Sequence, residues 1–338
     1  MILVTGATGI LGRVIVLELL KRGRTVRATH RDSSNLADVE NSYKFYTENS
    51  DLLFKKIEWI RVDFLDIHSL ENALIGITEV YHCAGKVSFH PDDRQNVYQS
   101  NIEGTKNLLY ACENSTVKKF CFVSSISVLD GVDETGQVTE DSEFNSKLPH
   151  SSYAKSKHFS EMEVWRASAE GLNTVIVNPG VIIGSGNWHS SSGEMFGTFD
   201  KYPYAMCGST NYVDVRDVAQ ITVTLMEKEI FGERFVLISE NKKLLHVANQ
   251  VRAKLGKPDA KVIPKFFLEV GHVLNVLFGW LVPQLRLLTK INVETVTSHH
   301  EVSNKKIRER LAYSFIPIDE SIDFHLTNYI SDQEKRSL

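Results

Sequence analysis

The 338-residue sequence predicts an α/β fold in which a doubly wound parallel sheet is joined to a smaller, mostly helical C-terminal lobe. Through the first half, short β-branched runs alternate with longer stretches of helical periodicity, which is the pattern of βαβ units. A glycine-rich segment lies directly between the first strand-like run and the first helical run. The hydrophobic share of 42% and the charged share of 24% are typical of globular proteins and exclude a disordered or fibrous chain.

The order of elements fits one open sheet. We expect its strands at residues 2–5, 25–30, 57–62, 79–82, 119–124 and 173–178. We expect helices between them at 11–22, 69–74, 97–114 and 153–170. Segment 185–208 is rich in Ser, Gly and aromatic residues, which favours a loop or lid. Regular structure then returns as a strand and helix in 212–227, a strand at 235–238 and a mostly helical stretch over 245–326.

The charge pattern restricts the partners. There are 38 Lys and Arg residues against 42 Asp and Glu residues, a formal net charge of −4, with no basic block that could follow a phosphate backbone. We therefore expect no nucleic-acid partner. The strand-like run at Met1 to Thr5 leaves no room for a targeting leader, so we expect a cytoplasmic protein.

A long apolar stretch over 263–288 is the one candidate for membrane contact. Charged residues and a proline interrupt it, and its charge-free part is shorter than the roughly 20 residues that span a bilayer. We expect no stable membrane insertion. Its apolar side chains recur at helical spacing, and packing against the core or a lid is the favoured interpretation, with a membrane-binding face as the alternative. These side chains are Phe266, Phe267, Val270, Leu274, Leu277 and Leu281.

Cysteine and histidine usage predicts no metal site. The four cysteines have no paired CxxC spacing, and two of them lie in apolar, strand-like runs, so reduced thiols are expected. The histidines are scattered and lack carboxylate or cysteine companions at the spacing of metal ligands.

The glycine segment has the spacing and the context of a dinucleotide-binding loop. Gly6 permits the tight turn, Gly9 lets the backbone approach a pyrophosphate, and Gly12 lets the helix pack closely on the strand. The start of the helix supplies unpaired N–H groups and a positive dipole for the anion. Within this loop we expect cofactor contacts from Gly6, Thr8, Gly9, Ile10, Leu11 and Gly12.

The position of this loop indicates which part of the chain binds the cofactor and which part binds the substrate. Residues 1–182, rejoined by about 212–240, are expected to form the cofactor-binding domain of Rossmann type. Residues 183–211 and 241–330 are expected to form the substrate-binding lobe and its lid.

The end of the second strand indicates which cofactor binds. NAD-preferring sites usually place an acidic residue there for the ribose hydroxyls, but this chain has His30 and Arg31. A guanidinium can hold a 2′-phosphate with two hydrogen bonds, so NADP(H) is preferred and NAD(H) stays an option. A solvated surface arginine is the alternative explanation of Arg31.

Two later strands also end in candidate cofactor contacts. Asp63, followed by Phe64, would lie near the adenine edge, although a turn-forming aspartate explains Asp63 almost as well. The small residues Cys83, Ala84 and Gly85 end the fourth strand, as a backbone passing close to the cofactor requires.

The candidate catalytic groups are a tyrosine, a lysine and a serine. Tyr153 and Lys157 are four residues apart, so they share one face of a helix. A free phenol has a pKa of about 10, and a nearby ammonium favours the phenolate, so Lys157 is expected to tune Tyr153. Ser125 follows an apolar strand at its carboxyl end, where its hydroxyl could hold a substrate oxygen, and Ser124 could share that role.

Together these motifs resemble the extended short-chain dehydrogenase/reductase superfamily, which includes the NAD(P)-dependent epimerases and dehydratases. The TGxxGxxG loop, the serine after a strand and YxxxK occur in the family's order, and segments 101–107, 178–181 and 212–219 support the likeness. Residues 26–32 are similar to the dihydroflavonol reductase group, and the apolar segment 263–288 to steroid-dehydrogenase-like relatives. The chain departs from the family in a lid without a matching motif and in Ala312, where Gly is more usual.

The resemblance implies roles for particular residues. Tyr153 would be the general acid, Lys157 would also bind the nicotinamide ribose, Ser125 would orient the carbonyl, and Arg31 would meet the 2′-phosphate. Pro179, Gly180 and Val181 would flank the nicotinamide. Two long helices, 97–114 and 153–170, could pair two copies into a homodimer, as in relatives.

The resulting functional hypothesis is an NADP(H)-dependent reductase acting on the carbonyl of a small, hydrophobic organic molecule. Its alternative is an NAD-dependent nucleotide-sugar epimerase or dehydratase, against which the basic residue at position 31 argues. A non-catalytic NADP sensor is the third class, and such sensors typically lose the tyrosine and lysine that this chain retains.

Overall fold

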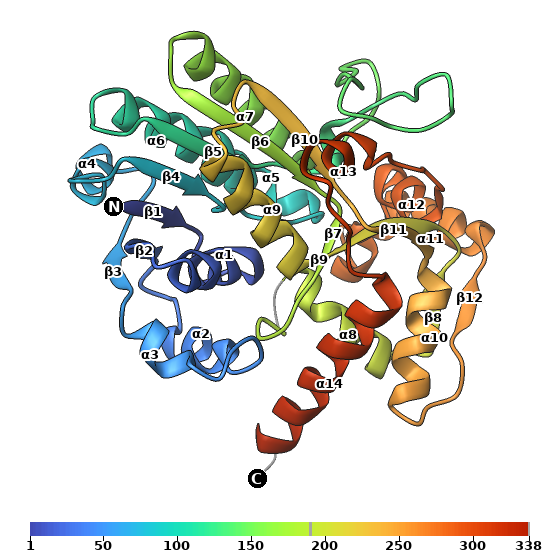
Figure 1. Ribbon diagram of the computed structural model, residues 1–338. Coiled ribbons are helices and arrows are strands. Elements are labelled where there is room, and N and C mark those ends of the chain that lie inside the picture. The colour runs from blue at the N-terminus through green and yellow to red at the C-terminus, as the bar shows by residue number, and fades with distance from the viewer. Residues whose placement is uncertain (189–190, 337–338) are drawn as a thin grey trace.

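The computed structural model describes residues 1–188 and 191–336, and a seven-stranded parallel sheet forms its centre (Figure 1). The strand order is β10-β6-β5-β4-β1-β2-β3, so the chain winds outward from β1 in both directions and the predicted doubly wound fold is confirmed. The strands are β1 (Ile2–Thr5), β2 (Val26–His30), β3 (Glu58–Arg61), β4 (Glu79–His82), β5 (Lys119–Val123), β6 (Asn173–Pro179) and β10 (Glu233–Leu237).

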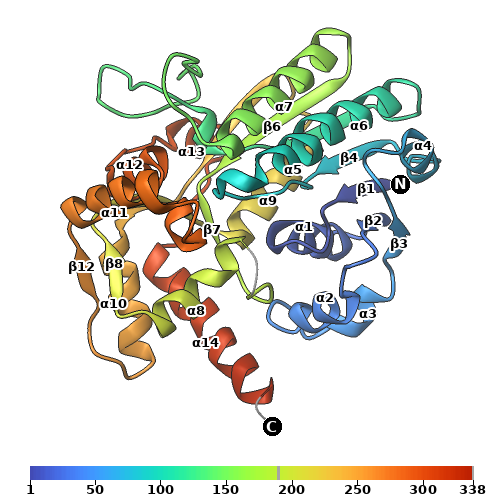
Figure 2. The same ribbon diagram turned by 180° about the vertical axis from the view of Figure 1, so that it is seen from behind.

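Helices cover both faces of this sheet, which explains why its strands are apolar on both sides (Figures 1 and 2). Within β1, Ile2 and Val4 pack on one face and Leu3 on the other. The first face carries α1 (Ile10–Lys21), α9 (Val215–Glu227), α2 (Leu36–Tyr43) and α3 (Ser50–Phe54). The opposite face carries α4 (Ile67–Ala73), α6 (Gly104–Glu113) and α7 (Ser152–Ala169).

The predicted helix over 97–114 is interrupted. It begins as α5 (Arg94–Tyr98), passes through a π-helical turn at Gln99–Glu103 and continues as α6. Such turns widen a helix locally and are common at functional sites. Here the turn contains Asn101, whose buried side chain faces α7.

The second unit of the structure surrounds a separate apolar cluster. Two small sheets belong to it: β7 (Val181–Ile183), β9 (Ser209–Asp214) and β11 (Glu240–Lys243) form one, and β8 (Tyr204–Met206) pairs with β12 (Lys261–Ile263). Helices α8 (Glu194–Lys201), α10 (Leu244–Lys254) and α14 (Ile318–Arg336) contribute to this cluster. Helices α11 (Lys265–Phe278) and α12 (Lys290–Thr297) contribute no residue to it, and α13 (Lys305–Leu311) packs instead on the main sheet, through Ile307 and β10. The segment expected to be a loop or lid therefore contains α8 and β8, whose side chains Phe196 and Ala205 are buried in this cluster.

Buried polar groups join three segments of the second unit. The Asp214 carboxylate accepts hydrogen bonds from Arg216, Ser321 and His325, and the other ring nitrogen of His325 lies 2.7 Å from the Ser185 hydroxyl. Although this chain of contacts is arranged like a catalytic triad, its Ser185, His325 and Asp214 side chains are fully buried, so it joins α14 to β9 and to the segment after β7.

A buried arginine fixes the glycine loop. The Arg13 guanidinium donates to the carbonyl oxygens of Thr8, Gly9 and Gly186 at 2.6, 3.2 and 2.9 Å. It therefore links the loop to the segment that leaves β7. Sequence analysis missed this residue, because an arginine on an apolar helix gives no sign of its buried partners.

The apolar stretch over 263–288 differs from expectation. Its six periodic side chains were expected to pack, but all six are exposed, between 40 and 66% of their surface. In α11 only Leu268 and Gly271 are buried. None of the helices in the described part of the chain is long and apolar enough to cross a bilayer.

Ala312 shows why glycine is usual at its position. It follows α13 with φ of 51° and ψ of 43°, a left-handed conformation that closes the helix but crowds a β-carbon.

We predict that Ala312→Gly raises the free energy of unfolding by about 1 kcal/mol, because glycine adopts this conformation without that crowding. Chemical denaturation measures the change. Ala253→Gly, at an exposed position within α10, is the matched control and should lower stability by about 1 kcal/mol. Equal losses in both variants would contradict the prediction.

Candidate active site

The carboxyl ends of β1, β4, β5 and β6 meet at one edge of the sheet, where ligands of doubly wound sheets bind. The glycine loop follows β1, residues 83–85 follow β4, Ser124 and Ser125 follow β5, and β6 ends at Pro179. Helix α7 brings Tyr153 and Lys157 to the same edge. The structure thus gathers most of the candidate residues that the sequence scatters over 180 positions.

The glycine loop has no room for side chains at its two tightest points. Gly6 has φ of 64°, and a β-carbon there would lie 2.6 Å from the Ala84 nitrogen. A β-carbon on Gly12 would lie 2.2 Å from the Gly6 carbonyl oxygen. The first helical N–H groups of α1, which begins at Ile10, have no carbonyl partner within the helix and can bind an anion. The residues present therefore fit a dinucleotide pyrophosphate.

Arg31 follows β2 directly, where the sequence predicts contact with the 2′-phosphate of NADP. The residue is exposed, and its backbone N–H donates to the Ser34 hydroxyl. The neighbouring Asp32 carboxylate is paired with Arg61 at 2.8 Å.

The Asp63 carboxylate accepts a hydrogen bond from the Leu65 N–H at 2.9 Å, as a turn-forming aspartate does. Phe64 beside it lies against Gly104 of α6, and its carbonyl oxygen accepts a hydrogen bond from Asn107. Both residues lie at the sheet edge that follows β3, where the sequence places the adenine.

The segment after β4 is held by polar contacts on both sides. The Ala84 N–H donates to the Thr5 hydroxyl, and the Lys86 N–H donates to the Asn101 side chain at 2.7 Å. Asn101 in turn donates to Ser156 of α7 at 2.8 Å. Gly85 lies so close to Lys157 that a β-carbon would approach the ammonium to 3.1 Å. Sequence analysis named Asn101 only within a family segment, and its role in positioning this turn comes from the π-helical geometry.

Lys157 is fixed between the sheet and the segment after β4. Its buried ammonium donates to the Val123 carbonyl oxygen at 2.7 Å and lies over the Phe122 ring. Burial lowers the pKa of Lys157 to about 8, while Cys83 and Glu161 act in the opposite direction. Burial also raises the pKa of the Cys83 thiol to about 12, so this cysteine is a neutral neighbour.

Tyr153 and Ser125 lie within hydrogen-bonding reach of each other. Burial raises the pKa of Tyr153 to about 12, and the hydrogen bond with Ser125 opposes that rise. The spacing with Lys157 predicted a lowered pKa, whereas burial raises it. The phenol is therefore protonated at neutral pH and is suited to donate a proton. Its ring also meets the Phe89 ring edge-on, with 5.9 Å between the centroids.

The buried carboxylate of Glu161 lies near the Lys157 ammonium. Glu161 is one turn beyond Lys157 on α7 and accepts a hydrogen bond from Asn178 at 2.7 Å. Asn178 also donates to the Ser125 carbonyl oxygen, so it joins the end of β6 to the end of β5. Burial raises the pKa of Glu161. These two residues were not predicted to act at the site, although Glu161 continues the i, i+4 series that begins at Tyr153.

The segment after β6 approaches the site through Pro179, Gly180 and Val181. Gly180 is required there, because a β-carbon would lie 2.3 Å from the Asn211 carbonyl oxygen. Val181 pairs with Tyr212 of β9, so this part of the site rests on the second unit.

Comparison with known proteins identifies the family. The family model for the NAD dependent epimerase/dehydratase family matches residues 2–237. The chain belongs to this family. It is 29% identical over 259 residues to sterol demethylase protein B of Methylococcus capsulatus, covering 76% of this chain and 75% of that protein. It is 29% identical to a putative dihydroflavonol 4-reductase of Synechocystis (82% and 77% covered) and 32% identical to cinnamoyl-CoA reductase 1 of Oryza sativa (75% and 74%).

Solved structures share the fold of this epimerase/dehydratase family member. The crystal structure of gox2253 has a TM-score of 0.81 at 24% identity, with 98% of each chain covered. UDP-glucuronic acid 4-epimerase from Bacillus cereus, solved with UDP-glucuronic acid and NAD, has a TM-score of 0.76 at 19% identity, with 98% and 99% covered. The predicted likeness to the extended short-chain dehydrogenase/reductase superfamily is confirmed, and the protein is an enzyme of the oxidoreductase or epimerase type.

A buried histidine beneath the site predicts a pH dependence of stability. His82 lies 2.7 Å from the Thr5 hydroxyl and 2.9 Å from the Thr105 hydroxyl, and burial lowers its pKa to about 3. Because the unfolded chain takes up the proton near pH 6.5, stability from this neutral histidine is complete above that pH and is lost as the pH falls towards 3.

We predict that lowering the pH from 7 to 5 reduces the free energy of unfolding by about 2 kcal/mol through His82 alone. His82→Gln removes the titrating group and should show a correspondingly smaller pH dependence, whatever its stability at pH 7. Denaturant titrations at pH 5, 6 and 7 measure both proteins. The same pH slope in both would show that His82 does not contribute.

Proposed function

We propose that this protein is an NADP(H)-dependent reductase that converts the carbonyl group of a small, hydrophobic ketone or aldehyde into an alcohol. The observation that carries the proposal is the protonated Tyr153 beside Ser125, with the Lys157 ammonium fixed one helical turn away. The similarity to dihydroflavonol and cinnamoyl-CoA reductases supports a carbonyl substrate.

The proposed chemistry divides between cofactor and chain. NADPH, when bound, supplies a hydride for the carbonyl carbon. The Ser125 hydroxyl orients the carbonyl oxygen, and the Tyr153 phenol donates its proton to that oxygen as negative charge develops there. The Lys157 ammonium then stabilises the phenolate and binds the nicotinamide ribose. Glu161 and Asn178 hold this part of α7 against the ends of β5 and β6.

The proposal also covers the residues that bind each part of the cofactor. We propose that the glycine loop binds the pyrophosphate, that Asp63 and Phe64 border the adenine, and that residues 83–85 and 179–181 border the nicotinamide half. Arg31 would bind the 2′-phosphate, and the exposure of its side chain leaves it accessible to that group. The pairing of Asp32 with Arg61 further reduces the number of free carboxylates that could bind ribose hydroxyls. Residues 1–182 and 212–240 would then be the cofactor domain, and 183–211 with 241–330 the substrate lobe.

Nucleotide-sugar epimerisation is the second candidate function, favoured by the fold shared with UDP-glucuronic acid 4-epimerase. Such an enzyme returns the hydride and keeps its cofactor oxidised and tightly bound. Identification of the nucleotide released by denaturing the purified protein separates the two: NADP(H) or no nucleotide supports the reductase, and retained NAD supports the epimerase.

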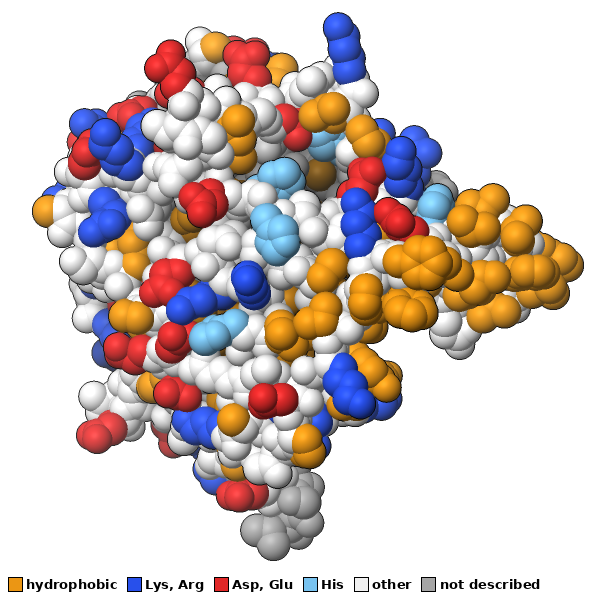
Figure 3. All heavy atoms as spheres, turned by 90° about the vertical axis from the view of Figure 1, so that its right-hand side faces the viewer, with side chains coloured by type: hydrophobic (Ala, Val, Ile, Leu, Met, Phe, Trp, Pro, Cys, Tyr) orange, Lys and Arg blue, Asp and Glu red, His pale blue; other side chains and the backbone are white. Residues whose placement is uncertain are grey.

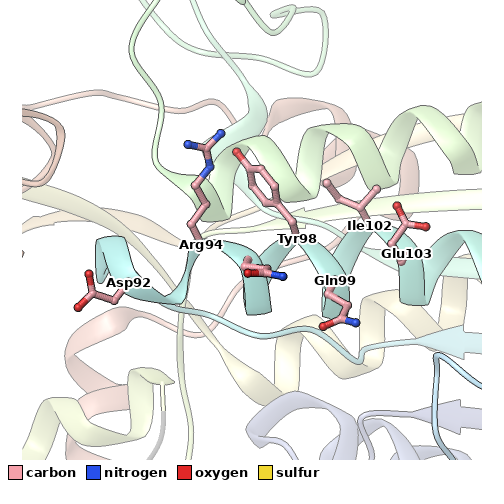
Figure 4. A pocket seen from close by; sticks show the side chains of 7 residues that line it. Asp92, Arg94, Tyr98, Gln99, Ile102 and Glu103 are labelled. Atoms are coloured by element: carbon pink, nitrogen blue, oxygen red, sulfur yellow. The ribbon is translucent and has the colours of Figure 1, made fainter.

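We also propose a homodimer formed through α6 and α7. Their outer faces expose Tyr110, Phe159 and Met162 to between 49 and 55%. A hollow lined by α5 and the π-helical turn adjoins this surface, with the Arg94 and Tyr98 side chains at its rim (Figure 4). The hollow contains none of the candidate catalytic residues, so it is a surface feature separate from the active site.

We predict that Tyr153→Phe lowers kcat for any accepted carbonyl compound by about 100-fold or more and leaves the Kd for NADPH nearly unchanged, because the phenol acts on the substrate oxygen in the transition state. Lys157→Met should weaken both properties. Steady-state kinetics and cofactor fluorescence give the two readouts. Thr135→Val, which removes an exposed hydroxyl outside both the site and the proposed dimer face, is the control. Full turnover by Tyr153→Phe would refute the proposed mechanism.

We predict that NADPH binds at least tenfold more tightly than NADH, a difference of about 1.4 kcal/mol, and that Arg31→Ala removes this preference by weakening only NADPH. Fluorescence titration with both cofactors measures it. Arg308→Ala, an exposed arginine of α13, controls for the loss of one positive charge. An unchanged NADPH affinity in Arg31→Ala would exclude this residue as the phosphate ligand.

A further inference from the structure

The largest apolar surface of this protein belongs to the segment 265–288, which we call the apolar hairpin. It consists of α11, a turn and the 3-10 helix at Pro283–Leu287. Figure 3 shows hydrophobic side chains gathered on a projection from the side of the molecule that carries α11 and β12. Monomeric soluble proteins rarely expose an apolar surface of this extent without a binding function.

The exposed side chains cover most of the hairpin, and only the side of α11 that carries Leu268 and Gly271 is buried. Neighbouring positions in α11, such as Val276, Leu277 and Phe278, are 70, 57 and 46% exposed, although they point in different directions around the helix. Trp280 in the turn is 72% exposed. A protein groove would cover one apolar face, whereas a lipid phase can contact a projection whose exposed apolar side chains point in several directions.

The charges of the hairpin are restricted to its two ends. Residues 270–285 contain no Asp, Glu, Lys or Arg, while Lys265 and Glu269 lie at one end and Arg286 at the other. These end charges are paired: Lys265 with Glu269 at 3.8 Å, and Arg286 with Asp92. This distribution matches a membrane interface, with charges at the level of the headgroups and apolar side chains below it.

Four polar side chains of the hairpin have hydrogen-bond partners within it, which lowers the cost of immersion in lipid. The His272 ring and the Asn275 amide both contact the Leu288 carbonyl oxygen, at 2.9 and 3.3 Å. The Trp280 indole donates to the Leu277 carbonyl oxygen, and Arg286 donates to the carbonyl oxygen of Gly279. The turn can therefore enter an apolar phase without leaving these groups unpaired.

The geometry specifies shallow insertion. Helix α11 has 14 residues, about 21 Å in length, whereas the hydrocarbon core of a bilayer is about 30 Å thick. The helix and its turn can enter one leaflet and return.

The base of the hairpin is connected to the segment that lies beside Tyr153. Arg286 pairs with Asp92, and Asn292, at the start of α12, donates to the Phe89 carbonyl oxygen at 3.1 Å. Phe89 is the residue whose ring meets Tyr153, and it is itself 49% exposed, next to the 43% exposed Val87. The surface beside Tyr153 is thus continuous with the base of the hairpin.

We propose that the apolar hairpin inserts into one leaflet of a lipid membrane and holds the segment beside Tyr153 against the membrane surface. The occupant of the hairpin surface is lipid, and the binding is driven by apolar insertion rather than by charge, since the cations at the ends of the hairpin are already paired. This deepens the proposed reductase function, on which its consequence for the substrate rests: an apolar carbonyl compound dissolved in the membrane would reach Tyr153 directly.

Vesicle flotation tests the insertion. The full chain should float with vesicles of phosphatidylcholine alone and remain bound in 0.5 M NaCl, because screening by salt weakens charge attraction but not apolar insertion. Val276→Glu/Trp280→Glu should reduce the bound fraction at least tenfold, while its melting temperature stays unchanged because both side chains are exposed. Leu52→Glu/Ile75→Glu, at 66 and 67% exposed positions on α3 and after α4, is the matched control and should float like the parent.

Hydrogen exchange on the vesicle-bound protein tests the orientation. Peptides covering 87–92 and 273–282 should gain protection, and a peptide covering 50–54 should not. No flotation, or equal flotation of the hairpin variant and the parent, would overturn the proposal, as would protection that spares 87–92. A concentration-dependent dimer that is abolished by Val276→Glu/Trp280→Glu, without vesicle binding, would identify a second copy as the occupant instead. Tyr153→Phe should float normally, so the insertion and the reductase function can fail independently.

Discussion

The hydrogen bond from the Lys157 ammonium to the Val123 carbonyl oxygen is the contact on which the site depends. It attaches α7 to the end of β5, and it sets Tyr153 above the same sheet edge as the glycine loop. The ammonium is buried, so its charge is acceptable only with such a partner and with Glu161 nearby. Gly85 leaves room beside the ammonium. The Asn101 side chain in the π-helical turn accepts a hydrogen bond from the next residue, Lys86, and so holds this segment in place.

The same burial determines the protonation of the site. Removal from water favours the neutral form of each group, so Tyr153 keeps its proton and the affinity of Lys157 for its proton is reduced. A protonated phenol next to Ser125 is poised to give a proton to a carbonyl oxygen, which is the step that reduction requires. Developing negative charge on the substrate would meet a hydrogen-bond donor without any rearrangement of the chain.

The second unit has an apolar core of its own and an exposed apolar surface. Its inner side chains pack around Trp188, Phe196 and Tyr329, and a buried polar contact between Asp214 and His325 fixes α14 to β9. Helix α11 is excluded from this packing. Exposure of so many apolar side chains to water costs free energy. Contact with an apolar phase such as lipid would remove that cost.

The sequence by itself determined the sheet, the glycine loop and the chemical types at the site, because these follow from local periodicity and short spacings. Strands β1 to β6 could be predicted to within one or two residues, and so could α1 and α7. The tertiary structure alone decided which distant groups meet: Arg13 with Gly186, Glu161 with Asn178, and Phe89 with Tyr153. It also decided the direction of the Tyr153 pKa shift, since burial raises a pKa that the spacing with Lys157 had predicted to be lowered. The apolar hairpin shows the same division. Its periodicity is identical whether the helix packs inside or projects outward, and only the path of the chain determines which of the two occurs.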